Sequence, residues 1–543
     1  MLYAIRRSLP LMTIKKTLAV VSAASVALTL AACGSDSNDS AAGGSASGDN
    51  LITAWGSEPQ NPLIPANTNE TGGGRIVDSI YSGLVYYDSE GKTQNEIAES
   101  IEPNDDNTEF TIKLKETNFS DGSPVTAKNF VDAWNYAVAN DQLNASFFGN
   151  IKGYKEGVKE LEGLKVVDDL TFTVTLANPE QDFPAQLGYS AFYPLHESAF
   201  EDMDAFGQNP IGNGPYKLSE WNHNQDATVV PNEEYKGGQK VANDGVKFVF
   251  YTDTDAAYAD LLSGNLDLLD SVPDSAFDVY EADLGDRAVN QPYAGFQSFT
   301  IGENLEHFSG EEGKLRRQAI SHAINREEIT ETIFKGTRTP AKDFTSPVLP
   351  GYSEDIKGNE VVKYDPEKAK KLWAEADKIN KWASPSFEIA YNADGGHKSW
   401  VDAVSNSIKN TLGIEAVGAP YPDFKSLRDE VTNRTIKTAF RTGWQADYPS
   451  LGNFLAPQYQ TGGSSNDGDY TNEEFDKLLV EAAKSSSQEE AAKKYNEAQA
   501  LLFEDLPDIP LWYPNATGGF SEAVSNASFN WKGVPVYYEI TKN

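Results

Sequence analysis

The chain contains one cysteine among its 543 residues, so no disulfide can form within it. No stretch reaches the 18 or more consecutive apolar residues expected of a membrane-spanning helix. Motifs of common enzyme classes are missing as well: there is no GxSxG nucleophile elbow, no HExxH zinc motif and no Walker-type phosphate loop. The sequence therefore predicts a protein that a large core holds together and that is not an enzyme.

Histidines and charges point to no metal, cofactor or nucleic acid. The 5 histidines are scattered, without a pair at i,i+3 or i,i+4 spacing, so no zinc site is expected. Acidic residues outnumber basic ones by 81 to 45, which gives a net charge of −36. Such a polyanion repels nucleic acid and anionic lipid, so neither is an expected partner, and solubility alone would explain the charge.

The first 32 residues have the layout of a signal peptide. Basic residues precede an apolar run at 17–30, which is too short to span a bilayer comfortably. The segment LAACG that follows contains Cys33, the only cysteine, and resembles the lipobox of bacterial lipoproteins. This resemblance implies cleavage of residues 1–32, lipidation of Cys33 and anchoring at the extracytoplasmic face of the cell membrane. The alternative is a plain secretory signal followed by an unmodified cysteine.

Residues 33–50 are accordingly expected to form the lipidated cysteine and a flexible tether. From Gly34 to Asn50 there is no aromatic and no large aliphatic residue, and this composition predicts a reach of about 20–25 Å. Folded structure is expected to begin near Leu51. The remaining chain is long enough for a large core divided among two to four lobes.

Local patterns predict strands and helix starts in the folded part. Alternating apolar residues predict strands at 110–114, 170–176 and 246–250. Asp365 before Pro366 predicts an N-cap followed by proline at the first helical position. Capping boxes, each with a glutamate three residues later, predict further helix starts at Asn325, Thr471 and Ser487.

A strand-helix-strand-helix-strand pattern spans 386–447. Its elements are expected at 387–391, 398–411, 414–418, 423–432 and 436–443. Such a run implies a parallel sheet, and ligands collect at the carboxyl ends of parallel strands. Polar residues just past two of these strand ends are therefore candidate ligand contacts: Asn392, Asp394, His397, Gln445, Asp447 and Tyr448.

Seven segments occur in the order found in a known family. They are WGSEPQNPLIP at 55–65, IYSGL at 80–84, FSDGSPVTAKNF at 119–130, GNGPY at 212–216, RQAISHAINR at 317–326, GWQADY at 443–448 and LPDIPLW at 506–512. Together they resemble the family 5 solute-binding proteins of ABC importers, which bind oligopeptides and dipeptides. Most of these residues are typical of turns, caps and core, so the resemblance defines the fold better than the ligand.

The resemblance implies a three-lobed α/β fold of the type II periplasmic-binding-protein kind. Lobe I would combine 51–81, 190–297 and 510–543, an extra domain would cover 82–189, and lobe II would cover 298–509. Two lobes joined by a hinge would close around the ligand. The implied function is capture of oligopeptides by a monomer and their delivery to the transmembrane subunits of an ABC permease.

The resemblance also implies roles for individual residues. Asp447 would pair with the peptide α-ammonium, and the main chain of Gly443 and Gln445 would pair with the peptide as an added strand. Further roles would be C-terminal carboxylate binding by Arg441 and His397, and the lining of side-chain pockets by Trp444 and Phe424. Sequence alone leaves open a turn or N-cap role for Asp447, a core role for the two aromatic residues and simple solvation for His397.

Three other functions remain open from the sequence. The first is the same fold adapted to another solute, such as nickel, haem or an oligosaccharide. The second is a surface hydrolase, which the missing motifs oppose. The third is a peptide-pheromone receptor, which sequence cannot separate from a nutrient-uptake protein.

Overall fold

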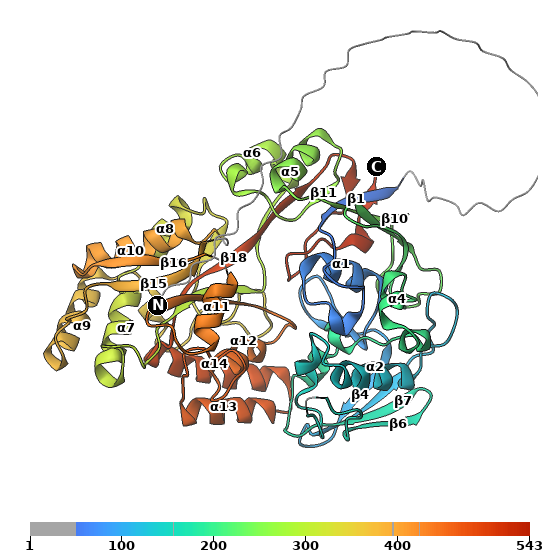
Figure 1. Cartoon of the computed structure of the whole chain (residues 1–543), viewed down its shortest axis with the longest axis horizontal. Helices are drawn as coiled ribbons and strands as arrows, with labels where there is room; N and C mark the ends of the chain where they lie inside the picture. Colours follow the sequence, from blue (N-terminus) through green and yellow to red (C-terminus); the bar gives the residue numbers. More distant parts are fainter. Residues whose placement is uncertain (1–49, 156, 394–395, 423) are drawn as a thin grey trace, which may run out of the picture. The chain divides into compact units, whose positions relative to one another are not determined.

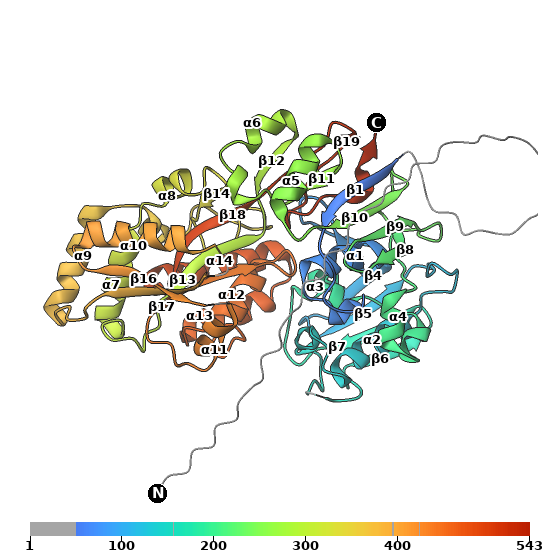
Figure 2. The same ribbon diagram turned by 45° about the horizontal axis from the view of Figure 1, so that its top comes forward.

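The computed structural model describes residues 50–155, 157–393, 396–422 and 424–543. The expected signal peptide, the expected lipidation site Cys33 and Asp394 lie outside these residues. None of the described helices is both long enough and apolar enough to cross a membrane. Figure 1 labels the helices and strands, and Figure 2 shows them from a second direction.

The largest sheet among the described residues has 12 strands. Its order is β16 (Ala416–Tyr421), β15 (Phe387–Asn392), β17 (Ala439–Gln445), β13 (Gly295–Thr300), β18 (Asp508–Phe520), β11 (Leu268–Leu269), β1 (Leu51–Gly56), β10 (Gly245–Phe250), β9 (Asp226–Pro231) and β8 (Tyr216–Asn222). Two more strands, β12 (Ala288–Pro292) and β14 (Arg338–Pro340), also pair with β18.

The long strand β18 connects the sheet regions of the two expected lobes (Figure 2). Its first half pairs with β13 and β14, and its second half pairs with β12 and β11. The expected lobe boundaries at 297/298 and 509/510 therefore fall inside β13 and β18.

The expected strand-helix-strand-helix-strand segment is present and parallel. β15 pairs in parallel with β16 and β17, and helices α10 (Lys398–Leu412) and α11 (Phe424–Thr432) connect them. The second and third strands begin later than expected, because Gly413 and Arg434 adopt positive φ angles of 72° and 57° where the helices end. As a result Trp444 and Gln445 are the last residues of β17 and do not follow it.

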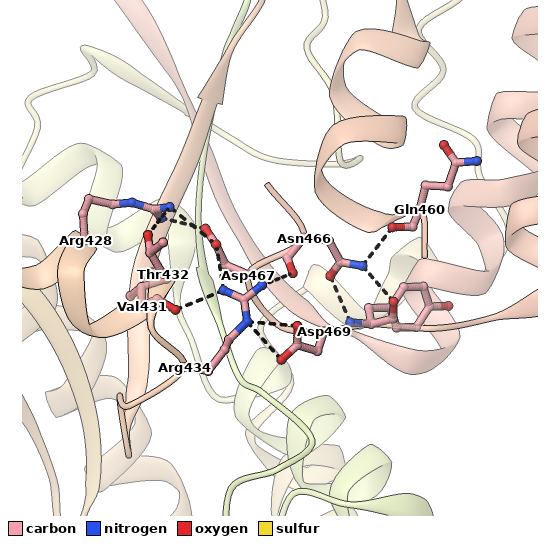
Figure 3. A network of polar contacts seen from close by, with 9 residues as sticks. Arg428, Val431, Thr432, Arg434, Gln460, Asn466, Asp467 and Asp469 are labelled. Carbon is pink, nitrogen blue, oxygen red and sulfur yellow. Dashed lines mark hydrogen bonds and ion pairs between the residues drawn. The ribbon is translucent and has the colours of Figure 1, made fainter. Parts of the chain in front are cut away.

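Ion pairs fix the end of α11 against the loop at 466–469 (Figure 3). Arg428 donates to Asp467 Oδ2 at 2.6 Å, and Arg434 Nε donates to Asp469 Oδ1 at 2.9 Å. The Asn466 side chain accepts from the Tyr470 N–H at 2.9 Å and shapes the same loop. These contacts hold in place a helix that packs against β15 and β16.

The described residues of expected lobe II form six further helices. They are α7 (Gly310–His322), α8 (Arg326–Thr332), α9 (Pro366–Ile379), α12 (Leu451–Tyr459), α13 (Glu473–Ala483) and α14 (Gln488–Asp505). The expected N-caps Asp365, Asn325 and Ser487 each accept a main-chain N–H three residues later. The expected cap at Thr471 is wrong by one residue, because the Asn472 side chain accepts from two main-chain groups, Glu474 N and Phe475 N.

The expected extra domain contains a four-stranded antiparallel sheet. Its order is β4 (Ala98–Pro103), β5 (Glu109–Leu114), β7 (Thr171–Thr175) and β6 (Leu164–Asp168), which confirms the strands expected at 110–114 and 170–176. The strand expected at 246–250 is β10. Phe130 and Trp134 of helix α2 (Ala127–Ala139) pack against Phe172 of β7.

Buried hydrophobic residues form two main clusters. The first joins Ile76 and Val246 of expected lobe I to Phe130 of the expected extra domain, and the second lies in expected lobe II. The remaining elements are α1 (Thr71–Ile80), β2 (Val85–Tyr87), β3 (Thr93–Asn95), α3 (Phe183–Gln186), α4 (Met203–Gln208), α5 (Thr254–Ser263), α6 (Tyr280–Leu284), β19 (Val524–Ser525) and β20 (Thr541–Lys542). The lobe boundaries stay predictions.

Candidate functional site

Strand β17 has one paired edge and one open edge over its last five residues. β13 covers the first edge in antiparallel register, from Gln445 opposite Gly295 to Phe440 opposite Thr300. On the other edge, β15 pairs with β17 only at Ala439 and Phe440 among the described residues. Residues 441–445 therefore present a strand edge that another extended chain can join.

The hydrogen-bonding phase of the ladder shows which residues serve that open edge. The Ala446 N–H donates to the Ala294 carbonyl at 2.9 Å, so this pair is of the hydrogen-bonded type. Hydrogen-bonded and non-hydrogen-bonded pairs alternate along an antiparallel ladder, so the main-chain groups of Trp444 also face β13. The main-chain groups of Gly443 and Gln445 point toward the open edge.

Asp447 lies two residues past the end of this strand, and Asn453 of α12 holds it. The Asp447 main-chain N–H donates to Asn453 Oδ1 at 3.0 Å, and Asn453 Nδ2 donates to Asp447 Oδ2 at 3.1 Å. Trp444 Nε1 donates to the same Asn453 oxygen at 3.2 Å. Asn453 is buried and lies in the first turn of α12, after the N-cap Ser450. The carboxylate is thus oriented by a rigid element.

Asp447 lines a cavity of about 320 Å³. Gln445 and Ala446 line it beside Asp447, and the other walls come from expected lobe I and the extra domain. These walls include Arg75, Asp78, Tyr87, Tyr189, Lys532 and Tyr538. The cavity therefore lies between segments that are far apart in the sequence and belong to different expected lobes.

Desolvation raises the pKa of Asp447, while its hydrogen bond to Asn453 and the charge of Lys532 oppose that rise. The same desolvation makes a bare carboxylate unfavourable there, because a buried charge is stable only when it is paired or well hydrogen-bonded. A cation entering the cavity would therefore stabilise the ionised form of Asp447.

His397 lies in a different cavity, of about 450 Å³. It occupies the N-cap position of α10, and its Nδ1 accepts from Trp400 Nε1 at 3.0 Å. Gln297 also lines this cavity and pairs with Gly443 across the β13–β17 ladder. The first cavity therefore meets β17, and the second meets its neighbour β13.

Arg441 and Phe424 form a third group. Arg441 Nε donates to Asn392 Oδ1 at 2.8 Å, and its guanidinium lies 4.9 Å from the centre of the Phe424 ring. The Phe424 side chain is 48% exposed. Neither residue lines the two cavities described above. Trp444 is half-buried and packs against the hydrophobic core of expected lobe II.

The structure thus brings together part of the expected site. Trp444 and Asp447 share Asn453, and Gln445 lines the Asp447 cavity, whereas Arg441, Phe424 and His397 lie elsewhere. The sequence did not indicate Asn453, Asp78, Tyr189 or Lys532. Asn453 could have been found as a polar residue soon after the strand end, but the other three belong to distant segments that only the fold brings together.

Comparison with known proteins defines the family. The model of the bacterial extracellular solute-binding proteins, family 5 (middle), matches residues 92–466. The chain belongs to this family.

Similar proteins include the dipeptide-binding protein DppE of Bacillus subtilis, which is 27% identical over 468 residues, or 81% of this chain and 82% of DppE. The oligopeptide-binding protein OppA of the same organism is 24% identical over 83% of this chain and 85% of OppA. The structure of Haemophilus influenzae OppA in complex with the peptide RPPGFSPFR has a TM-score of 0.68 and 25% identity, over 91% of this chain and 98% of that chain.

The structure of the murein tripeptide binding protein MppA of Escherichia coli shares the fold. Its TM-score is 0.71 at 23% identity, and the match covers 91% of this chain and 98% of that chain. These findings confirm the expected family and the α/β fold of periplasmic binding proteins. They also identify the chain as a solute-binding protein.

Proposed function

We propose that this protein captures oligopeptides outside the cytoplasm and delivers them to the permease of an ABC importer. The observation that carries the proposal is the position of Asp447, a hydrogen-bonded carboxylate in a cavity at the end of an open strand edge. Relatives named for oligopeptides and dipeptides support it. Chemical groups that all peptides share, namely the backbone and the two termini, also favour this function.

A binder that tolerates many peptide sequences must draw affinity from the backbone and the termini. The open edge of β17 offers main-chain groups at Gly443 and Gln445, which suit strand addition. Asp447 offers a negative charge for the α-ammonium at the end of that strand. Trp444 and Phe424 would contact side chains, in keeping with their place on and beside β17.

The opposite end of the peptide would lie toward Arg441. Arg441 and Asp447 are six positions apart in the sequence, which corresponds to about 20 Å of extended chain. A peptide of about six residues has the same length, so Arg441 is placed for the C-terminal carboxylate of such peptides. His397, in its separate cavity, would receive the C-terminus of peptides of another length.

Anchoring and assembly complete the proposal. Cys33 would carry the lipid, residues 34–50 would act as the tether, and the protein would work as a monomer near its permease, where tethering raises its effective concentration. The Cys33→Ala variant should then leave the membrane fraction. Membrane association of this variant that persists in high salt would contradict a lipid anchor at this residue.

Other solutes remain the alternative, because relatives of similar identity carry other names. Heme-binding protein A of Haemophilus influenzae is 28% identical over 80% of this chain, and a probable deoxycholate-binding protein of Escherichia coli is 27% identical over 83%. Haem and deoxycholate are anions that lack an ammonium group. The carboxylate of Asp447 therefore favours peptides, which bring an ammonium group, over either of them.

Thermal unfolding with candidate ligands tests the proposal. The protein should first be freed of co-purified ligand by unfolding and refolding, and mass spectrometry should identify what is released. Peptides at a hundredfold excess over their dissociation constant should stabilise it by about 2.7 kcal/mol and raise its melting temperature. A rise with haem or deoxycholate, and none with a broad peptide library, would contradict peptide capture.

A further inference from the structure

The cavity that contains Asp447 has a second carboxylate on its opposite wall. Asp78 of α1 lines it from expected lobe I, and its side chain is exposed to the cavity. Asp447 comes from expected lobe II. The charges of both carboxylates act on the same two tyrosines, Tyr87 and Tyr189, so they lie in one electrostatic environment.

A lysine supplies positive charge between these carboxylates. Burial raises the pKa of both Asp78 and Asp447, and the charge of Lys532, which lines the same cavity, opposes that rise in each. Its Nζ lies 5.5 Å from the ring centres of Tyr189 and Trp531. Among the described residues it forms no direct ion pair with a carboxylate. Its ammonium is therefore held by ring faces and by the field of two acids, and no single partner fixes it.

The other charges of the cavity have partners of their own. Arg75 is paired with the buried Asp270. Glu70 caps α1, since its Oε1 accepts from Gly73 N at 2.9 Å and from Gln60 N at 3.2 Å. Asp447 and Asp78 have hydrogen-bond partners in Asn453 and Tyr193 but share one cation, Lys532, so this pair of acids is short of one positive charge.

We propose that the ammonium of a bound peptide is held by two carboxylates, Asp447 from lobe II and Asp78 from lobe I, and that Lys532 is their counter-ion in the empty site. This inference rests on the proposed function. The incoming ammonium supplies the missing charge, because two carboxylates then face two cations. Since the carboxylates belong to different lobes, the ammonium also links the lobes and favours their closure around the peptide.

The arrangement predicts opposite effects on the affinity for a free peptide when the charge of Asp78 or the charge of Lys532 is removed. Removal of the Asp78 charge takes away one partner of the ligand ammonium. Removal of the Lys532 charge takes away a cation that competes with the ligand for both acids. Neither change should affect a peptide whose amine is blocked by acetylation, because that peptide brings no cation.

The test measures binding of one pentapeptide of small residues, with a free or an acetylated N-terminus, by calorimetry on ligand-free protein. Asp78→Asn should weaken binding of the free peptide by roughly tenfold or more, as expected when one member of a charge pair is lost. Lys532→Met should strengthen it severalfold. Both variants should bind the acetylated peptide as the wild type does. Asp286→Asn, at an exposed position outside the cavity lining, is the matched control and should bind both peptides unchanged.

The proposal would be overturned if Asp78→Asn lowered the affinity for both peptides equally. It would also be overturned if Lys532→Met lowered the affinity for the free peptide. The outcomes separate this inference from the proposed function. If the wild type binds neither peptide, the proposed function fails. If the wild type prefers the free peptide and Asp78→Asn keeps the same preference, only this inference fails.

Discussion

Asn453 holds Asp447 by two hydrogen bonds, accepting from its main-chain N–H at 3.0 Å and donating to its carboxylate at 3.1 Å. The carboxylate is therefore fixed in direction before any ligand arrives, and its negative charge is partly satisfied. This arrangement suits a receptor that must bind an ammonium without a large rearrangement, because fixed groups lose little conformational freedom on binding.

Asn453→Ala should weaken peptide binding through Asp447. The variant removes a hydrogen bond to a charged group, which contributes about 1.5–3 kcal/mol, so affinity for free peptides should fall by roughly tenfold or more. Acetylated peptides, which do not use the ammonium site, should lose much less. Calorimetry with both peptides measures this difference, and an equal loss for both would show that Asn453 supports the fold and not the ammonium site.

Segments of the expected extra domain and of expected lobe II meet at a pair of acids, half-buried Glu180 and buried Asp182. Asp182 accepts hydrogen bonds from Ser450 and, at 2.9 Å, from the Tyr495 hydroxyl. Burial, together with the charge of neighbouring Asp182, raises the pKa of Glu180 to about 8. In the unfolded chain a glutamate ionises near pH 4.5. The folded protein therefore keeps a proton on this pair that the unfolded chain releases.

The free energy of unfolding should accordingly decrease as pH rises from about 4.5 to about 8. Below that window Glu180 is protonated in both states, so its contribution is fully present; above it the contribution is lost. Glu180→Gln should remove this dependence, and its stability advantage over the wild type should grow across the window. Denaturant unfolding at several pH values measures this, with exposed Glu160→Gln as the control. A difference that does not change with pH would contradict the prediction.

The open edge of β17 predicts a requirement for peptide N–H groups. A peptide that is N-methylated at one amide facing Gly443 or Gln445 should bind roughly threefold to tenfold more weakly, since one main-chain hydrogen bond contributes about 0.5–1.5 kcal/mol. Scanning N-methylation along one pentapeptide should show alternating sensitive and insensitive positions. A scan with no alternation would argue against strand addition.

The sequence predicted the segment around β15 and β17 well because periodic apolar residues and helix caps encode it locally. The predicted boundaries of β16 and β17 were less accurate. Gly413 and Arg434 adopt positive φ angles after the preceding helices, and both strands begin later than predicted. Asp447 could be placed because polar residues at the ends of parallel strands gather at one edge of the sheet. Asp78 and Lys532 could not, because their approach to Asp447 depends on tertiary packing between distant segments.

Arg441 and His397 should respond to different peptide lengths. Arg441 lies on β17 and His397 lies in the second cavity, so a carboxylate at one peptide length cannot reach both in the same way. Arg441→Ala and His397→Ala should each weaken binding of some lengths and spare others. Amidation removes the C-terminal carboxylate of a peptide. It should therefore cause little further loss of affinity in the variant that already lacks the residue that binds this carboxylate. Uniform loss across all lengths would mean that both residues only support the fold.

The central claim is that Asp447 binds the α-ammonium of a peptide, and a double-mutant cycle tests it most directly. Asp447→Asn keeps the shape and removes the charge, and it should lower the affinity for a free peptide by about 2–5 kcal/mol, roughly thirtyfold to several-thousandfold. Acetylation of the peptide should cause a similar loss with the wild type and much less further loss with the variant. Calorimetry on ligand-free protein gives all four affinities. Equal binding of free and acetylated peptides by the wild type would contradict the claim.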